Sequence, residues 1–168
     1  MTSMRILHVA SNYSQTGGAE RFCGSLCHSL REKGLQSFIV AGQSDGAVNT
    51  DLPRPIATLP VEKNLWLRKF GLDYINFATQ KKFTRLLERY TPDIVHFHTF
   101  YGLPSYLIRL AQTVCPVTVT LHDAWLAFAD SSPWNPKFGL ANSYLKVPHG
   151  YVHRAANRAI MGNASLVS

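Results

Sequence analysis

The feature that most constrains the fold is an alternation of short apolar runs with helical patterns. Runs that are apolar on both faces are typical of buried parallel strands. Between the first two runs, apolar residues recur at three- and four-residue steps from Ala19 to Leu30, which predicts a helix with Gly34 at its C-cap. The strand-length runs occupy residues 5–10, 37–41, 56–59, 93–98, 116–122 and 164–168.

The remaining segments alternate in the same way. Helices are expected over 65–90, with Gly71 as a break, and over 103–114 and 149–161, and a long loop over 123–143. Such alternation predicts an α/β fold, a doubly wound and mostly parallel sheet with helices on both faces. Because the chain stops as its last apolar run begins, we expect it to be a fragment cut at a domain boundary.

Composition bounds the partners and the compartment. Lys and Arg number 17 against 10 Asp and Glu in 168 residues, and the net charge of +7 favours anionic partners. Charged residues are 16% of the chain, below the ~25% of a typical domain, which suggests that part of the surface is covered in the working state. Three cysteines, without a signal-peptide pattern or a long apolar run, favour a reducing cytoplasm. No zinc-finger or RRM pattern indicates nucleic acid binding.

Polar residues follow three of the expected strands, at the sheet edge where parallel α/β proteins bind ligands. Gly17 and Gly18 follow the first strand and lead into the helix. They allow backbone N–H groups to approach an anion, or they form a tight turn that needs a positive φ. The dinucleotide fingerprint G-x-G-x-x-G is absent.

Histidines mark the other two strand ends. His96 and His98 share a strand face; His96 lies between apolar neighbours and is expected to be the more buried, whereas His98 at the strand end is the better functional candidate. With His122 and Asp123 they could form a metal-dependent hydrolase site. The preferred interpretation has no metal, because acidic residues are few, and makes His122 a contact for a substrate hydroxyl or phosphate.

A basic and aromatic stretch suggests a lipid surface. Trp66, Arg68, Lys69 and Phe70 have the composition of a membrane-surface helix, which the basic residues of 81–89 extend. The alternative is an ordinary amphipathic helix packed on the sheet.

Four segments together resemble a known family: MRILHVASNYSQTGGAERF, DIVHFHTFYG, PVTVTLHDAW and the closing NASLVS. They look like the N-terminal half of a family-4 retaining glycosyltransferase of the two-domain GT-B architecture. The resemblance implies that residues 1–168 form a Rossmann-like domain that binds the acceptor, and that the C-terminal donor-binding domain is absent. It further implies transfer of a sugar from a UDP- or GDP-linked donor to a lipid-linked or polysaccharide acceptor, with no cofactor or metal.

The resemblance also implies residue roles. His122 matches the catalytic histidine near the donor sugar, and Gly17 and Gly18 match the glycines that approach the donor phosphates or the acceptor. The family's Arg, Lys and Glu-x7-Glu that hold the donor cannot be assigned here, so the chain alone is expected to be inactive. Ala124 stands where the matching variant of the family has tyrosine. The acceptor side would be lined by His98, Tyr101, Gly102, Asp123 and Trp125.

Two other functions stay open. The chain could be a stand-alone phosphate- or nucleotide-binding module built on Gly17 and Gly18, or the metal-dependent hydrolase described above. Under the glycosyltransferase hypothesis the partners are a nucleotide-sugar, a glycan or lipid-linked acceptor and an anionic membrane surface. The expected location is the cytoplasm, peripheral on the inner face of the membrane.

Overall fold

The computed structural model describes residues 3–13, 17–43, 52–61, 76–100 and 102–122, and short strand segments at 134–135, 139–140 and 165–167. The helices are α1 (Gly18–Glu32), α3 (Phe77–Tyr90) and α4 (Leu107–Gln112). The strands are β1 (Arg5–Asn12), β2 (Gln36–Gln43), β3 (Ala57–Thr58), β4 (Ile94–Phe97), β5 (Val117–Thr120), β6 (Trp134–Asn135), β7 (Gly139–Leu140) and β8 (Ser165–Val167).

The main sheet has six strands in the order β3-β2-β1-β4-β5-β8, and all its pairs are parallel. β1 lies in the interior, where Leu7 pairs with Phe38 on one side and Val95 on the other. The six middle residues of β1 are buried, which is the physical reason for an apolar run on both faces. The strand order confirms the predicted α/β fold, which is a doubly wound, Rossmann-like sheet.

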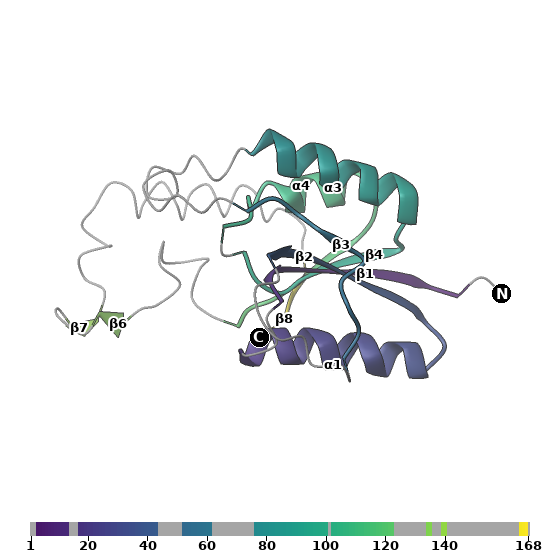
Figure 1. Ribbon diagram of the computed structural model, residues 1–168, viewed down its shortest axis with the longest axis horizontal. Helices are drawn as coiled ribbons and strands as arrows, with labels where there is room; N and C mark the ends of the chain where they lie inside the picture. Colours follow the sequence, from purple (N-terminus) through teal and green to yellow (C-terminus); the bar gives the residue numbers. More distant parts are fainter. Residues whose placement is uncertain are drawn as a thin grey trace.

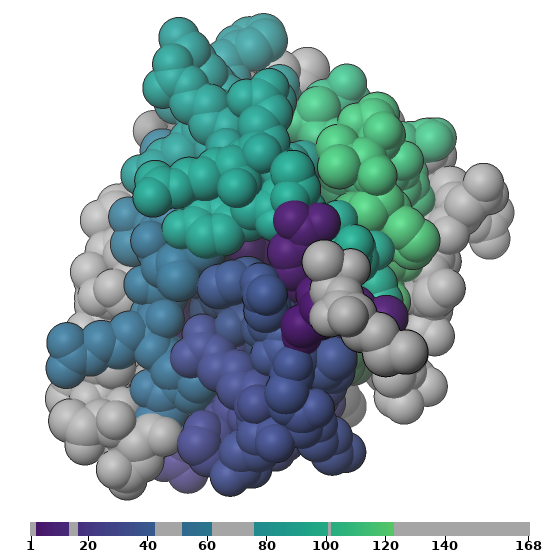
Figure 2. Space-filling model, turned by 90° about the vertical axis from the view of Figure 1, so that its right-hand side faces the viewer, coloured from purple at the N-terminus to yellow at the C-terminus, as the bar shows by residue number. Residues whose placement is uncertain are grey.

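Helices cover both faces of the sheet. In Figure 1, α1 lies on one face and α3 and α4 lie together on the other. The same layers are visible end-on in Figure 2, with α3 (teal) above, α1 (blue) below and the start of β1 (purple) between them. Each packed helix turns its buried residues to the sheet, as the sequence periodicity requires.

The two faces of the sheet carry different cores. The larger core lies under α3 and α4, where Phe83 is fully buried and its ring lies 6.0 Å from that of Phe97. The smaller core lies under α1 and includes Cys23 and Cys27, both fully buried. Both cysteines lie in the apolar pattern from Ala19 to Leu30, and the structure places them in the core. The α1 side of the sheet also buries polar groups, among them His8 and Ser37.

Helix ends follow local chemistry. After α1, Gly34 has φ +80 and donates its N–H to Arg31 O at 2.9 Å, and Leu35 N–H reaches Leu30 O at 3.0 Å. This Schellman motif confirms the predicted glycine cap. α3 begins where the Asn76 side chain accepts the N–H of Thr79 at 3.1 Å.

Some expected elements differ. α4 covers only Leu107–Gln112 of the expected 103–114, because the preceding residues form turns such as Leu107 N–H to Pro104 O at 3.1 Å. The expected loop 123–143 contains the antiparallel pair β6–β7. The expected helix residues 65–75 and 149–161 lie outside the described residues. So do the membrane-surface candidates Trp66, Arg68, Lys69 and Phe70.

Candidate ligand-binding site

A hollow of about 480 Å³ lies at the carboxyl edge of the sheet. This is a volume typical of small-ligand sites. Three strand ends and the start of α1 supply its walls, as the sequence predicted, because the carboxyl ends of parallel strands meet at one edge. Its polar or close-approach residues are Ser11, Asn12, Gly18, Glu20, Thr99 and His122.

The glycine turn after β1 does not use a left-handed backbone conformation. Gly17 is the N-cap of α1 with φ −89, and Gly18 is its first residue. Of the described glycines, Gly34 and Gly102 have a positive φ, so the interpretation of Gly17 and Gly18 as a positive-φ turn is wrong. A Cβ added at Gly17 would meet only the end of the flexible Glu20 side chain, which can move aside, and one at Gly18 would meet no atom of the described residues within 4 Å. Gly18 therefore leaves its backbone open to a ligand.

Two hydroxyls join the ends of β1 and β4 at the floor of the hollow. Thr99 Oγ1 accepts the backbone N–H of Ser11 at 2.9 Å and lies 2.9 Å from Ser11 Oγ. Ser11 is 4% exposed. Beside them, Asn12 Oδ1 is buried and has no hydrogen-bond partner among the described residues.

His122 is the exposed imidazole of this site. The ring of Phe22 meets it edge-on at 5.3 Å, and the ring of His98 is stacked 5.8 Å from it. Phe22 is one of the apolar residues in the repeating pattern from Ala19 to Leu30, but it is 46% exposed. Phe22 instead lies at the rim and covers His98, with ring centroids 5.9 Å apart.

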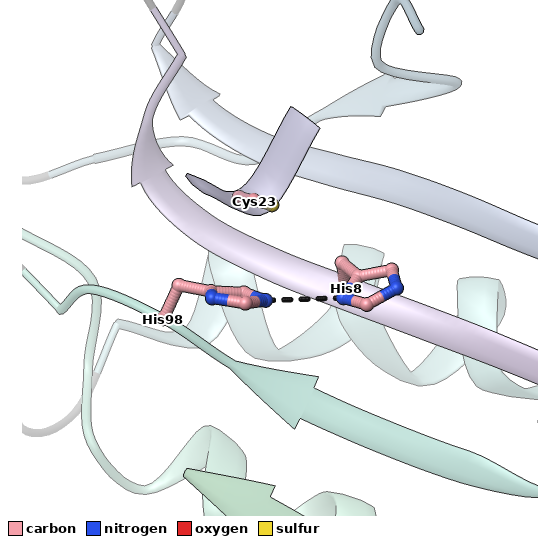
Figure 3. Close-up of side chains that lie close together, drawn as sticks. All are labelled: His8, Cys23 and His98. Atoms are coloured by element: carbon pink, nitrogen blue, oxygen red, sulfur yellow. Dashed lines mark hydrogen bonds between the residues drawn. The ribbon is translucent and has the colours of Figure 1, made fainter. Parts of the chain in front are cut away.

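Below the hollow lies a buried histidine chain. His98 is fully buried and His96 is only partly buried, so the expectation that His96 lies deeper is wrong; α1 covers the end of β4 through Phe22. His98 Nε2 lies 3.0 Å from His8 Nδ1 (Figure 3). His8 Nε2 lies 3.0 Å from Ser37 Oγ. The sequence analysis did not identify His8 as a site residue, because His8 lies inside an apolar run. In the sheet, His8 pairs with His96 on the neighbouring strand, which places it on the same face as the other histidines.

These histidines are neutral at physiological pH. Burial, together with the nearby His96 and Arg31, lowers the pKa of His8 to about 3. Burial and the proximity of His122 lower the pKa of His96 to about 4. Burial and three neighbouring imidazoles lower the pKa of His98 further. A neutral imidazole carries one N–H and one lone pair, so the hydrogen bonds run either from His98 through His8 to Ser37 or in the reverse direction. In both cases Nδ1 of His98 is buried without a partner among the described residues.

The cluster of His8, Cys23 and His98 is the metal-ligand grouping within the described part of the chain, with ligand atoms within 4.8 Å of one another. Both ring nitrogens of His8 already lie against protein atoms. Burial, with Cys27 and Glu20 nearby, raises the pKa of the Cys23 thiol and disfavours the thiolate that a metal needs. These residues fit a hydrogen-bonded core better than a metal centre.

The structure brings the three histidines of the hydrolase hypothesis together, with ring centroids 4.1 Å apart for His96 and His98 and 5.8 Å apart for His98 and His122. His96 Nε2 already bonds Thr120 Oγ1 at 2.7 Å, and the metal-ligand grouping of the described residues includes neither His96 nor His122. Asp123, Tyr101 and Trp125 lie outside the described residues. Gly102 is buried in the turn after β4, with φ +76, and does not line the hollow.

A parallel sheet of this order, with a glycine-bearing strand-to-helix turn and polar groups from three strand ends, defines a Rossmann-like ligand-binding domain. The family model for Glycosyltransferase Family 4 matches residues 16–164. The chain therefore belongs to Glycosyltransferase Family 4.

Other comparisons are more distant. The structure is similar to that of SsfS6, a glycosyltransferase of Streptomyces sp. SF2575, with a TM-score of 0.44 and 16% sequence identity. That likeness covers 98% of this chain and 48% of SsfS6, so the chain spans about half the length of that protein. None of the curated proteins compared matches the chain. Within the described residues, no helix has the length and apolar character needed to cross a membrane.

Proposed function

We propose that the chain is the N-terminal, acceptor-binding domain of a retaining glycosyltransferase. The whole enzyme would move a sugar from a UDP- or GDP-linked donor to a lipid-linked or polysaccharide acceptor. The observation that carries the proposal is the hollow at the carboxyl edge, walled by Gly18 and His122 in a family 4 domain. Gly17 and Gly18 would face the donor phosphates or the acceptor.

His122 would be the catalytic contact to the donor sugar. Its ring is exposed at the rim and held between two aromatic neighbours, so it can meet a hydroxyl without rearrangement of the sheet. His98 would act from below, by supporting the ring of His122. Tyr101, Asp123 and Trp125 are proposed for the acceptor side, and Gly102, buried in the turn after β4, would shape the backbone there.

The chain alone would not catalyse transfer. Negative charge builds up on the departing diphosphate, and cationic groups must stabilise it. Of the described residues that line the hollow, only His122 can become cationic. The cations and the Glu-x7-Glu motif of the family would come from a second domain.

The test is a transfer assay with the gene product that contains this chain, against a panel of UDP- and GDP-sugars and lipid or glycan acceptors. His122→Ala should lower turnover by about two orders of magnitude or more with the fold intact. His28→Ala, at an exposed position on α1, is the matched control. Full activity of His122→Ala would refute its role, and NMR of the product's anomeric centre tests retention.

We also propose that the protein attaches to an anionic membrane from the cytoplasm, and the outer face of α3 supports the electrostatic part of this proposal. Phe77 is 77% exposed at the start of this helix, and Lys81, Lys82, Arg85 and Arg89 are all exposed along it. An exposed aromatic beside a basic stripe suits lipid headgroups.

Vesicle sedimentation tests this attachment. The chain should bind phosphatidylglycerol vesicles more than phosphatidylcholine vesicles, and Lys81→Glu/Arg85→Glu should remove the difference. Lys33→Glu/Arg54→Glu makes the same charge change at exposed positions outside α3. Equal binding to both vesicle types would refute the electrostatic attachment.

A further inference from the structure

A row of buried polar side chains runs beneath His122 on the α1 face of the sheet. Ser37 lies on β2, His8 on β1 and His98 directly after β4, so three neighbouring strands each supply one member. Both steps along the row are 3.0 Å, from Ser37 Oγ to His8 Nε2 and from His8 Nδ1 to His98 Nε2. No member is more than 1% exposed. The row ends at the hollow, because the ring of His98 is stacked on that of His122.

This row holds the ring of His98 in one orientation. Both ring nitrogens of His8 lie against hydrogen-bond partners, so the His8 ring cannot turn without losing a bond. The far end of the row is fixed to α1, where Arg31 Nε donates to the backbone carbonyl of Ser37 at 2.7 Å. Since His8 holds Nε2 of His98, the ring of His98 presents a defined face to His122.

His98 is the contact through which the row reaches the site. Its ring centroid lies 5.8 Å from that of His122, with 25° between the ring planes. Phe22 packs against both rings from α1, with centroid distances of 5.9 Å to His98 and 5.3 Å to His122. The exposed imidazole is therefore restricted by two ring neighbours, one of which is itself held by hydrogen bonds that begin two strands away.

The stability of the fold does not account for this row. Nδ1 of His98 is buried without a partner among the described residues, which costs free energy. Burial also lowers the pKa of His8 and of His98, so both residues cost stability at acidic pH. An apolar ring in place of His98 would fill the same space without either cost. Polar groups that a fold retains at such a cost are expected at functional sites.

We propose that Ser37 and His8 are positioning residues, which act through His98 to hold the ring of His122 in its working orientation. Neither of them lines the hollow, so they act on the catalytic contact without touching a substrate. The proposal rests on the proposed function for the role of His122 and deepens it by adding residues of β1 and β2. It predicts that breaking the row lowers turnover and leaves substrate binding nearly unchanged.

The first test observes the ring of His122 directly and needs no activity. Ser37→Ala removes the end of the row and leaves the ring neighbours of His122 in place. In proton–carbon correlation NMR of the chain, it should shift the ring signals of His8, His98 and His122. Ser105→Ala, the matched control, removes a buried serine hydroxyl that has no partner among the described residues, and should leave these signals unchanged. Unchanged ring signals of His122 in Ser37→Ala would overturn the proposal.

The second test is the transfer assay with the whole gene product. His98→Phe keeps a ring of similar size against His122 but breaks the bond to His8. Ser37→Ala and His98→Phe should each lower kcat about ten-fold with KM nearly unchanged, and Ser105→Ala should change neither constant. The melting temperature of His98→Phe at neutral pH should be at or above that of the unaltered protein, which separates lost positioning from lost fold.

An unchanged kcat in Ser37→Ala or in His98→Phe would overturn the proposal, since ring stacking alone would then suffice. The proposed function is judged separately, by the activity of His122→Ala. Should that variant keep full activity, the catalytic role of His122 fails, and the NMR comparison still decides whether the row holds its ring.

Discussion

The histidines under α1 make the stability of this domain sensitive to mild acid. His8, His96 and His98 are neutral when folded, because burial depresses their pKa values below the ordinary 6.5. In the unfolded chain they regain that ordinary value and take up protons. The stability they allow is therefore fully present above about pH 6.5 and is lost as the pH falls toward the folded values of about 4 and 3.

The size of the effect follows from proton linkage. Each such histidine lowers the free energy of unfolding by about 2 kcal/mol between pH 7 and pH 5. Three of them together remove about 6 kcal/mol, against a total stability of about 5–15 kcal/mol for an ordinary domain. We therefore expect the free energy of unfolding to fall by about 6 kcal/mol between pH 7 and pH 5, which would unfold a domain whose total stability lies at the low end of that range.

Urea unfolding followed by circular dichroism at a series of pH values measures this loss. His96→Gln should recover about one third of it, because one titrating group is removed and the amide can keep a bond to Thr120. His28→Gln removes an exposed histidine that pairs with Glu32 at 3.4 Å and should leave the pH slope nearly unchanged. An equal urea midpoint at about pH 7 and pH 5, or equal effects of the two variants, would refute the reasoning.

Three further predictions concern packing, backbone and access. Phe83→Ala should lower the free energy of unfolding by about 3–5 kcal/mol, measured by urea unfolding, because it empties a fully buried site against Phe97; a loss under about 1 kcal/mol would contradict this packing. Gly34→Ala should cost about 1 kcal/mol in the same assay, because an L side chain is strained at φ +80; an unchanged midpoint would count against the cap geometry. Gly18→Val should leave the melting temperature within a few degrees but block sugar transfer by the whole enzyme, since its Cβ faces open space beside the hollow; undiminished transfer would show that the substrates lie elsewhere.

Local sequence predicted structure correctly where a residue pattern is compatible with only one kind of backbone or environment. Apolar runs on both faces predicted interior parallel strands, and β1 and β4 lie where these runs placed them. Gly34 predicted the end of α1 because few other residues tolerate a left-handed backbone. The same reasoning failed at Gly17 and Gly18, for which the sequence suggested a positive φ. Gly17 instead lies beside the Glu20 side chain, and Gly18 lines the hollow.

The local sequence pattern could not predict which polar side chains are buried. The sequence ranked His96 as deeper than His98, but depth depends on which helix covers the strand end. Phe22 belongs to the apolar pattern that predicted α1, but it lies at the rim and packs against His98. His8 entered the cluster only because β1 and β4 pair with His8 opposite His96.

The sequence by itself therefore determined the α/β fold class, most element positions and the edge of the sheet where polar residues gather, since these depend on periodicity and strand direction. The tertiary structure alone decided which of those polar groups reach a ligand. It paired Ser11 with Thr99, left Asn12 Oδ1 without a described partner, and turned the Glu20 carboxylate over the helix start. Those outcomes depend on contacts between segments far apart in the chain, which no local pattern encodes.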